Sequence, residues 1–555
     1  MPRGGNNGSL TEQFDGSTNP FSDSFIERRL ALVSDVNVSE RTEPHPDGFV
    51  EAAIEKDASC WQDVPINQLS THNLDPSCRL LLQPANEVDI QVAPETSSAR
   101  WMTLATLEGH DPVTCLAICQ GPAEPSVKIS LPIPMEVFFD SQTDAVEIRN
   151  RSPDTLLDFR RVDDDDDDDD DGDDGHVPVA PFASDRFSPG AWAVSGFGRA
   201  PALQFVLFPR KHRLEIVQQS LGLLQDSAGS KRRFSARIRQ QSLTRSGQSQ
   251  SQLWDVVKPV KSLTEAVGAQ TVRITGTDGT DYTIFRMSNA GPSASADVFA
   301  ARLSQYQGQL VVVKVLKPGP SSAASRALNW AREYRIHERL RSDTIVQLYG
   351  GDARIDALFL AHINAKDLAH QSWCERGVFQ GTGGDARRIL EDMARALAYL
   401  RTEKVLHNDI KPRNILYSRS TGATLIDFGL GSSDGDAPSS GGTPWYVPPE
   451  FLASGARAAP ADVWALGIVM LYLFNKVPLP DSGKEVAAWQ IREVATGRTA
   501  SAECMAQWLR RVEKARRALA ADQGIDSIVL QMLQPSPHER IHARELLRQL
   551  EELGT

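Results

Sequence analysis

The stretch LHNDIKPRNILY, residues 406–417, places four polar side chains within an otherwise apolar pattern of strand, loop and strand. His407 and Asp409 flank a single residue, and Lys411 and Asn414 follow them at short distances. A buried polar group costs free energy unless it is hydrogen-bonded, so a packed chain keeps such a set only where the groups serve one another or a ligand. The stretch therefore predicts a loop whose polar side chains share one chemical task.

The second half of the chain changes from strands to helices around this loop. The runs TVRIT, YTIFRM and LVVVKVL are typical of strands, whereas DARRILEDMARALAYLRTEK has the spacing of an amphipathic helix. The run VWALGIVMLYLF, Val463–Phe474, is apolar on all sides but too short to cross a bilayer, so we expect a buried helix there. Strands followed by helices predict an α+β fold.

A second polar motif follows the loop, because the apolar run ATLIDFGLG ends in Asp427, Phe428 and Gly429. Together the two motifs resemble the catalytic loop and the metal-binding segment of eukaryotic-type serine/threonine protein kinases. The resemblance covers roughly residues 280 to 550. It implies a two-lobed fold, with a β-rich lobe before a helical lobe, and ATP and Mg²⁺ as cofactors. It also implies protein Ser or Thr hydroxyls as substrates.

The resemblance assigns a role to each polar residue of these motifs. Asp409 is expected to orient the substrate hydroxyl and to accept its proton, and Lys411 to steady the phosphoryl group in transfer. Asn414 and Asp427 are expected to bind magnesium. Thr443, in GGTPWYVPPE, is expected to contact Asp409 and Lys411, as in serine/threonine kinases.

Lys314 lies in the apolar run LVVVKVLK, where a buried ammonium group needs an anion. By resemblance it holds the α- and β-phosphates of ATP and pairs with a helix glutamate. Glu333 in WAREYRIHERL is the preferred candidate for that glutamate, and Glu338 is the alternative.

The remaining nucleotide contacts are assigned by register with the family. In LFLAHIN, Ala361 takes the gatekeeper position, and His362 and Ile363 offer backbone groups to adenine. In GPSASADV only Gly291 remains of the glycine-rich pattern, and Val298 takes the place of the valine that covers the phosphates. Non-glycine residues in this hairpin limit its approach to phosphates. A second interpretation therefore stays open, a pseudokinase that acts as a scaffold or binding module with weakened nucleotide binding.

The resemblance also implies supporting contacts away from the reaction. Glu450 is expected to form a structural ion pair with Arg540, and Asp462 to accept backbone hydrogen bonds from the catalytic loop. His337 replaces the aliphatic side chain that usually packs near Phe428. A hydrogen-bonded core histidine explains it better than a partly polar spine does.

Asn408 stands where most such kinases have arginine, whose charge is neutralised by a phosphate on the activation segment. Asn408 carries no charge, and the segment from Asp427 to Glu450 is short and acidic. We therefore expect activity that does not depend on phosphorylation of this segment.

The first half of the chain carries no catalytic motif. We expect residues 1–97 to be mostly disordered, 98–217 to form a small β-rich, sandwich-like domain, 218–264 to be a linker and 265–555 to be the kinase domain. The prediction of strands in 98–217 rests on short alternating runs such as VKISLPIPMEVFFD, DAVEIRN and RLEIV. A protein is the expected partner of this domain.

Two segments of the first half concentrate charge. Eleven aspartates lie within residues 163–174, where they supply most of the net charge of −13, and we expect an exposed, flexible, solvated loop there. The segment KRRFSARIRQQSLTR, residues 231–245, suits nucleic acid, a nuclear address or the acidic loop. A solvated linker explains it at least as well, so nucleic acid is not a favoured partner. Ser235 and Ser242 follow basic residues, as sites of basic-directed kinases do.

Cysteine usage and the first residues bear on location. Of six cysteines only Cys115 and Cys119 lie near one another, which predicts neither a disulfide framework nor a repeated metal-ligand spacing. The first residues are polar and give no signal-peptide pattern. We expect a cytoplasmic or nuclear protein without a membrane partner.

Overall fold

The computed structural model describes residues 65–84, 90–93, 99–107, 112–162, 176–196, 201–219, 254–276, 281–291, 295–317, 322–433, 441–454, 458–482, 486–495, 499–519 and 524–554. Three expectations concern residues outside the described ones. They are the disorder of residues 1–64, the exposed acidic loop 163–174 and the basic segment 231–245. Contacts divide the described chain into two compact units. One comprises residues 65–331 and 350–362, and the other comprises residues 332–349 and 363–554.

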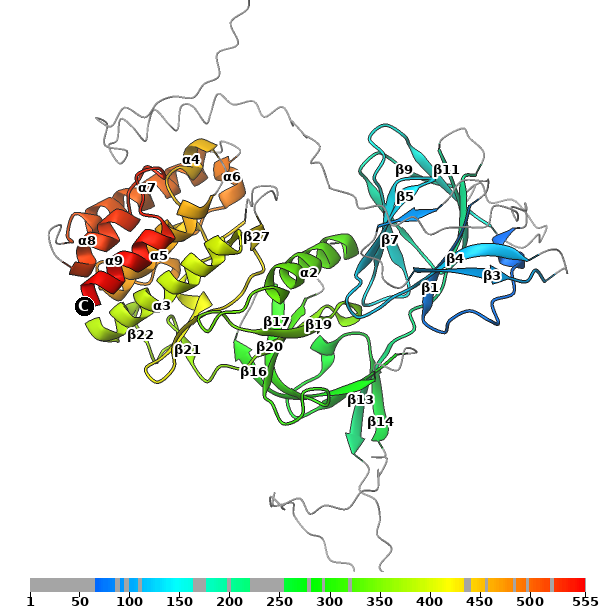
Figure 1. The fold of residues 1–555 in the computed structure, drawn as a ribbon, viewed down its shortest axis with the longest axis horizontal. Helices are drawn as coiled ribbons and strands as arrows, with labels where there is room; N and C mark the ends of the chain where they lie inside the picture. Colours follow the sequence, from blue (N-terminus) through cyan, green and yellow to red (C-terminus); the bar gives the residue numbers. More distant parts are fainter. Residues whose placement is uncertain are drawn as a thin grey trace, which may run out of the picture. The chain divides into compact units, whose positions relative to one another are not determined.

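The first unit begins with two antiparallel sheets that form a β-rich region (Figure 1). One sheet has the strand order β3-β4-β1-β12-β11-β8-β9 and the other β10-β7-β6-β5-β2. The elements are η1 Ile66–Gln68, β1 Cys78–Pro84, β2 Gln91–Val92, β3 Ala99–Leu104, β4 Val113–Cys119, β5 Ser126–Leu131, β6 Met135–Phe139, β7 Val146–Asn150, β8 Leu157–Arg161, β9 His176–Val179, β10 Ser184–Phe187, β11 Gly190–Gly196 and β12 Leu203–Leu207.

The core of this region lies between the two sheets. Strand β12 buries Leu203, Phe205 and Leu207, every second residue, as a strand with one covered face does. Phe205 belongs to the same apolar cluster as Val137 and Ile148 of the other sheet. Two sheets with a shared apolar interior make a sandwich.

Strand β1 lies within the N-terminal range that we expected to be mostly disordered. All seven of its residues are buried, and it pairs with β4 and β12. The apolar run CRLLLQP is the local signal for it, but the surrounding polar sequence obscured that signal because a single short run has no periodicity of its own.

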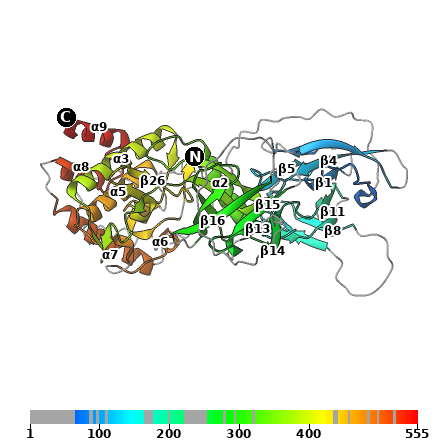
Figure 2. The ribbon, with the colours of Figure 1, turned by 90° about the horizontal axis from the view of Figure 1, so that it is seen from below.

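An eight-stranded sheet follows, in the order β14-β13-β15-β16-β17-β18-β20-β19. Its strands are β13 Arg213–Gln219, β14 Trp254–Val260, β15 Thr271–Thr275, β16 Tyr282–Gly291, β17 Ala296–Leu303, β18 Val311–Leu316, β19 Leu348–Asp352 and β20 Ala357–Ala361. Figure 2 shows β13 to β16 together. The run RLEIV, expected in the sandwich, forms β13 and pairs instead with β14 and β15. Alternation suits either sheet, so only tertiary pairing decides between them.

Helix α2, Ala323–Glu338, comes before β19, and the second unit is mainly helical. Its helices are α3 Gly383–Thr402, α4 Phe451–Ser454, α5 Ala459–Leu473, α6 Ile491–Ala495, α7 Thr499–Arg516, α8 Gly524–Met532 and α9 Ala543–Gly554, and its short strands are β21 Lys366–Asp367, β22 Cys374–Glu375, β23 Val378–Phe379, β24 Val405–Leu406, β25 Ile415–Ser418, β26 Gly422–Leu425 and β27 Ser432–Ser433. Strands come first and helices second, which confirms the expected α+β fold.

Helix α5 is the buried helix that the sequence predicts. Every residue from Ala461 to Leu473 is buried, which is the usual fate of a helix that is apolar on all sides. At Gly467 an added Cβ would lie 2.8 Å from Leu533 Cδ2, so the missing side chain lets α5 and the end of α8 approach closely. No helix in the described part of the chain is both long and apolar enough to cross a bilayer.

Arg540 ties the end of the second unit to the start of α5. Its two terminal nitrogens donate to Glu450 Oε1 and Oε2, each at 2.8 Å, which confirms the expected ion pair. The guanidinium also donates to the backbone oxygens of Gln534, Pro535 and Pro460, and its side chain is fully buried. A buried cation with this many acceptors is costly to remove alone, because the acceptors keep their burial and lose their donor.

We predict that Arg540→Met lowers the free energy of unfolding by about 3–5 kcal/mol, the usual cost of breaking a buried pair. Urea unfolding followed by circular dichroism measures the change. Arg548→Met is the matched control, because Arg548 pairs with Glu545 and Glu552 on the exposed side of α9 and its loss should change the urea midpoint far less. Equal losses in the two variants would contradict the prediction.

Candidate active site

The predicted site residues fall into two groups, one in each unit. The first unit contains Gly291, Val298, Lys314, Ala361 and His362, and the second contains Glu333, Ile363, Asp409, Lys411, Asn414, Asp427 and Thr443.

Asp409 follows strand β24, and three side chains donate to its carboxylate. Oδ2 lies 2.7 Å from Lys411 Nζ and 3.1 Å from Asn414 Nδ2. Oδ1 accepts from Thr443 Oγ1 at 2.8 Å, and Thr443 Oγ1 accepts from Lys411 Nζ at 2.9 Å. Asp409 is only 9% exposed, so these four predicted residues form one connected network with little access to water.

Thr443 reaches this network because its hydroxyl does not cap the helix that it precedes. It is the N-cap residue of the 3₁₀ helix Pro444–Tyr446, yet its side chain makes no cap hydrogen bond. A proline at the first helical position has no N–H that needs an acceptor. The Thr443 hydroxyl is thus available to join Asp409 and Lys411.

Asn414 and Asp427 are the predicted metal ligands, and a backbone hydrogen bond joins their segments. Ile426 N donates to Asn414 O at 2.9 Å. Asn414 Nδ2 also donates to Asp409 O at 2.8 Å, which leaves the amide oxygen as its side-chain acceptor. Asp427 has a φ of +69°, a left-handed conformation that few residues other than Gly, Asn and Asp adopt and that recurs at functional sites.

These oxygen donors fit Mg²⁺, which prefers hard oxygen ligands and usually keeps several water or phosphate ligands. In the described residues, no group of three or more His, Cys, Asp or Glu side chains could hold a metal ion by itself. An amide oxygen and a carboxylate oxygen therefore suit an ion that a phosphate-bearing ligand brings with it. They do not suit a structural metal with a complete protein shell.

Asp462, in the first turn of α5, fixes the backbone of the loop before Asp409. Its Oδ2 accepts from His407 N at 2.8 Å and its Oδ1 from Asn408 N at 2.9 Å, which confirms the predicted contact. Asn408 has a φ of +63°, so its backbone N–H turns toward the carboxylate in a conformation that Asn tolerates. The Asn408 side chain donates to Leu430 O and Ser432 Oγ.

Phe428 lies between two buried histidines. Its ring centroid is 4.8 Å from that of His337 and 4.9 Å from that of His407. His337 Nε2 lies 2.6 Å from a backbone carbonyl oxygen, which confirms a hydrogen-bonded core histidine. His407 Nδ1 accepts from Asp409 N at 3.2 Å, so its proton is on Nε2, which donates to Ile426 O.

In the first unit the strand register brings three predicted nucleotide-binding residues side by side. Val298 on β17 lies opposite Gly291 of β16 and opposite Lys314 of β18. Lys314 is 7% exposed, as expected for its apolar strand. Ala361 ends β20 opposite Val311.

An ion pair that the sequence analysis missed braces the β16–β17 hairpin. Arg286 Nη1 and Nη2 donate to Asp297 Oδ2 and Oδ1 at 2.7 and 3.1 Å, and Nη2 also donates to Asn289. The guanidinium lies over the Phe299 ring, 4.1 Å from its centroid. A bidentate pair of this kind fixes geometry as well as charge. The β16–β17 hairpin, which lacks the usual glycines, is therefore braced by Arg286 and its partners.

Two further missed contacts reach the segment after Asp427, one from α2 and one from the residue that follows it. Arg332 Nη2 donates to Gly429 O at 2.9 Å, and Arg339, just after the end of α2, donates through Nη2 to Ser433 Oγ at 2.6 Å. A cation therefore faces this segment, although position 408 has none.

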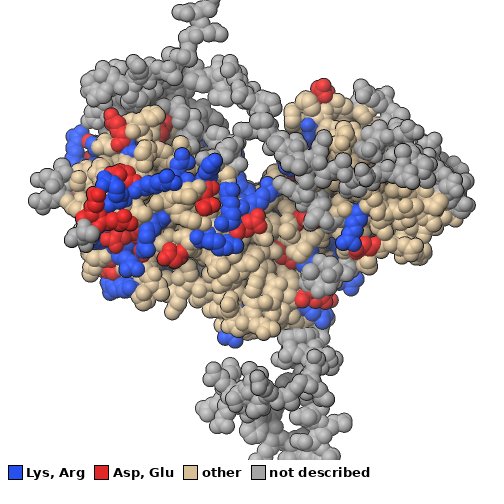
Figure 3. Space-filling model, in the orientation of Figure 1, with Lys and Arg blue, Asp and Glu red and all other residues tan. Residues whose placement is uncertain are grey.

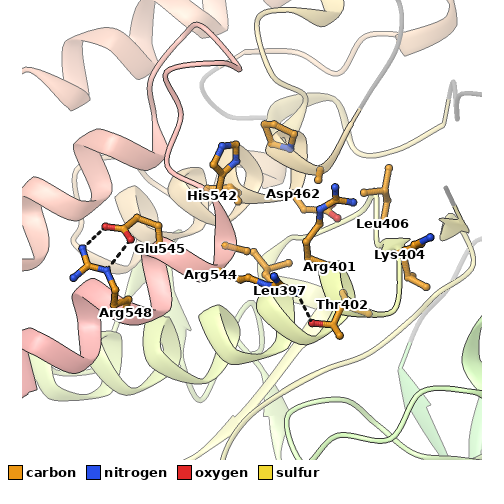
Figure 4. Close-up of a pocket in the computed structure, with 16 residues that line it drawn as sticks. Leu397, Arg401, Thr402, Lys404, Leu406, Asp462, His542, Arg544, Glu545 and Arg548 are labelled. Carbon is orange, nitrogen blue, oxygen red and sulfur yellow. Dashed lines mark hydrogen bonds and ion pairs between the residues drawn. The ribbon is translucent and has the colours of Figure 1, made fainter.

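A cavity of about 750 Å³ in the second unit lies elsewhere (Figure 4). The end of α3, strand β24 and the starts of α5 and α9 line it, and Figure 4 shows Arg544 near Thr402 and the Arg548–Glu545 pair. It shares Asp462 with the catalytic loop but none of the predicted site residues. On the face in Figure 3, charged side chains of both signs gather over the helical unit.

Comparison with known families agrees with the fold and with the network around Asp409. Residues 287–550 match the family model described as a protein kinase domain. The chain therefore contains a protein kinase domain at these residues, and its distant relatives are serine/threonine kinases.

Three relatives show how low the sequence identity is. The chain is 26% identical over 269 residues to serine/threonine-protein kinase PLK4 of Drosophila persimilis, which covers 46% of this chain and 31% of the relative. It is 32% identical over 197 residues to CBL-interacting serine/threonine-protein kinase 14 of Arabidopsis thaliana, covering 34% and 44%. It is 26% identical over 211 residues to MAP kinase kinase skh1/pek1 of Schizosaccharomyces pombe, covering 36% and 56%. The chain thus spans about a third to a half of these relatives' lengths.

We predict that Asp462→Asn accelerates amide hydrogen exchange at His407 and Asn408 by about 10- to 100-fold. The reason is that the new NH₂ group cannot accept one of the two backbone hydrogen bonds. Exchange measured by mass spectrometry on peptides that cover the catalytic loop tests this.

Asp392→Asn is the matched control. Asp392 is an equally buried carboxylate that accepts from Ala423 N at 2.7 Å, so its loss should accelerate exchange at Ala423 and leave the catalytic loop unchanged. Unchanged exchange at His407 in Asp462→Asn would contradict the prediction.

Proposed function

We propose that this chain is a serine/threonine protein kinase that transfers the γ-phosphoryl group of ATP to hydroxyl groups of protein substrates. The observation that carries the proposal is the network of Asp409, Lys411 and Thr443 within 2.9 Å of one another. The protein kinase family supports the reaction class, and the names of the relatives support Ser and Thr as acceptors.

In this proposal Asp409 acts on the substrate hydroxyl. A carboxylate offers about four acceptor positions, and the three protein donors leave room for one more donor. The incoming hydroxyl takes that position, which aims its oxygen at the phosphoryl group and gives its proton an acceptor. Lys411 keeps its positive charge next to the carboxylate, where it steadies the negative charge of the phosphoryl group in transfer.

The cofactors follow from the same family chemistry. Lys314 holds the α- and β-phosphates, with Glu333 as its pairing partner, and Gly291 and Val298 cover the phosphates. Backbone groups of His362 and Ile363, next to Ala361, hold adenine. Asn414 and Asp427 supply the protein ligands of Mg²⁺. When bound, Mg²⁺ would supply positive charge that offsets the charge developing on the phosphates.

The alternative is a pseudokinase that binds partners without catalysis, and the hairpin with few glycines is the feature that favours it. The Arg286–Asp297 pair weakens this alternative, because a braced hairpin can hold a defined approach to phosphates without glycine flexibility. The presence of all the polar catalytic residues weakens it further, since a binding module does not need them.

The direct test is transfer of radiolabelled phosphate from ATP to a generic basic protein. Wild type should label the substrate, while Asp409→Asn and Asp427→Ala should lower the rate by at least about 100-fold, because they remove the base and a metal ligand. Glu391→Gln, on the solvent side of α3, is the control and should keep the wild-type rate. Equal background labelling in wild type and Asp427→Ala would leave the pseudokinase as the function.

A second prediction concerns phosphorylation of the segment after Asp427. Phosphatase treatment should leave most of the turnover, because Asn408 has no charge to neutralise and Arg339 already donates to the unmodified Ser433 hydroxyl. A variant with Ser439 and Ser440 changed to Ala, which keeps the Ser433 hydroxyl, should behave alike. Ser439 and Ser440 lie outside the described residues. Ser432 is left intact because Asn408 donates to it.

Two substitutions of Thr443 serve as the paired control. Thr443→Ala should lose turnover because it removes the hydroxyl between Asp409 and Lys411, whereas Thr443→Ser keeps that hydroxyl and should retain turnover. A fall of roughly two orders of magnitude after phosphatase treatment, restored by rephosphorylation, would overturn this prediction.

A further inference from the structure

The N-terminus of helix α2 is capped by a residue from a distant part of the chain. The first four N–H groups of an α-helix have no partner within the helix. Ser322 Oγ accepts the N–H of Ser325, as a local cap does. The N–H of Ala324, however, donates to Glu147 Oε2 on β7 of the sandwich, at 2.9 Å and away from water (Figure 1). A carboxylate also suits the positive end of the helix dipole.

Glu147 is held in place for this task. It is 7% exposed, and its other oxygen, Oε1, accepts from Ser184 Oγ of β10 at 2.6 Å. Both carboxylate oxygens are therefore committed, one to the sandwich and one to the helix. A fixed acceptor of this kind positions its donor more strictly than a flexible surface side chain can.

A second carboxylate of the sandwich binds the next turn of α2. Asp140 Oδ1 accepts from Arg326 Nη2 at 2.9 Å, and the Arg326 side chain is 12% exposed. Asp140 Oδ2 accepts from Arg186 and Thr143, so the carboxylate is fixed from the sandwich side. The ion pair is mostly shielded from water, which strengthens it and makes the loss of one partner costly.

Ser141 extends this interface to the turn before β20. Its Oγ donates to Asp356 Oδ2 at 2.5 Å, and Arg326 Nε lies 3.6 Å from the same oxygen. Burial raises the pKa of Asp356 to about 6, although Ser141 and Arg326 favour its charged form. At neutral pH the charge of this buried carboxylate therefore depends on donors from both the sandwich and α2.

Apolar contacts complete the attachment. Phe138 of β6, fully buried, packs with Ala324 and Ala327 on the face of α2. One turn further, Trp330 Nε1 donates to Ala357 O at the start of β20, at 3.0 Å. The first half of α2 is thus held by polar and apolar contacts with the sandwich and by a hydrogen bond to strand β20 of the eight-stranded sheet.

We propose that Glu147, Asp140 and Ser141 are positioning residues for α2, and that the sandwich thereby sets the placement of Glu333. The inference rests on the proposed kinase function, in which Glu333 pairs with Lys314. Glu333 lies on the same continuous helix, nine residues after Ala324, so its backbone position follows from the helical geometry that begins at the capped end. The sandwich is then part of the catalytic apparatus through α2, and not only a docking module.

The test uses the full chain and a double-mutant cycle. Glu147→Gln keeps the size of the side chain but removes its charge, and it should lower kcat about tenfold through a shifted α2 population. In a Glu333→Gln background, which already lacks the pairing carboxylate, the same change should have no further effect on kcat. Arg326→Met is a second, independent disruption with the same expected pattern.

Glu136→Gln is the matched control. Glu136 is equally buried in the neighbouring strand β6 and accepts from Ser126, and within the described residues it has no hydrogen bond to α2. It should leave kcat unchanged, and amide exchange at residues 324–331 should accelerate in Glu147→Gln but not in Glu136→Gln. These two readouts separate a positioning role from general loss of stability, which would affect both variants.

The possible results separate failure of the positioning role from failure of the proposed function. An active wild type with unchanged kcat in Glu147→Gln, or an equal loss in the Glu333→Gln background, would overturn the positioning role. An inactive wild type would instead overturn the proposed function and the effect on turnover with it. Exchange at residues 324–331 would then still decide whether these carboxylates hold α2.

Discussion

The catalytic loop depends on one buried carboxylate, Asp462, which accepts the backbone N–H groups of His407 and Asn408. Asn408 presents its N–H in a left-handed conformation, which is sparsely populated for residues other than Gly, Asn and Asp. Asp462 is fixed in turn by α5, whose residues are buried on all sides. The backbone that orients Asp409 is therefore held by the packing of α5, a helix more than fifty residues later in the chain.

The same physical principle recurs at α2. The first N–H groups of a helix have no acceptor within the helix, and a carboxylate from a distant strand can accept one of them. Glu147 does so from the sandwich, while Arg332 of α2 donates to Gly429 in the segment after Asp427.

The sequence predicted which residues surround Asp409, but it did not predict the contacts that hold the neighbouring elements in place. His407, Asp409, Lys411 and Asn414 lie within one short motif, so their proximity follows from local spacing, and the resemblance to kinases added Thr443 and Asp462. The Arg286–Asp297 brace, the Arg339–Ser433 contact and the Glu147 cap were missed, because each joins a common surface residue type to a partner that only the folded chain brings near. Strand β13 was placed in the sandwich for a related reason, since its alternation suits two sheets equally well.

By itself the sequence determined the α+β class, the identity of the polar residues around Asp409 and the burial of α5. These properties follow from residue type and short-range periodicity, which are complete within a few turns or strands. Only the tertiary structure decided which sheet β13 joins, which carboxylate caps α2 and which cation faces Ser433. Hydrogen bonds and ion pairs require donor and acceptor within about 3 Å, and residues as far apart in sequence as Arg339 and Ser433 or Glu147 and Ala324 reach that distance only when the chain is packed.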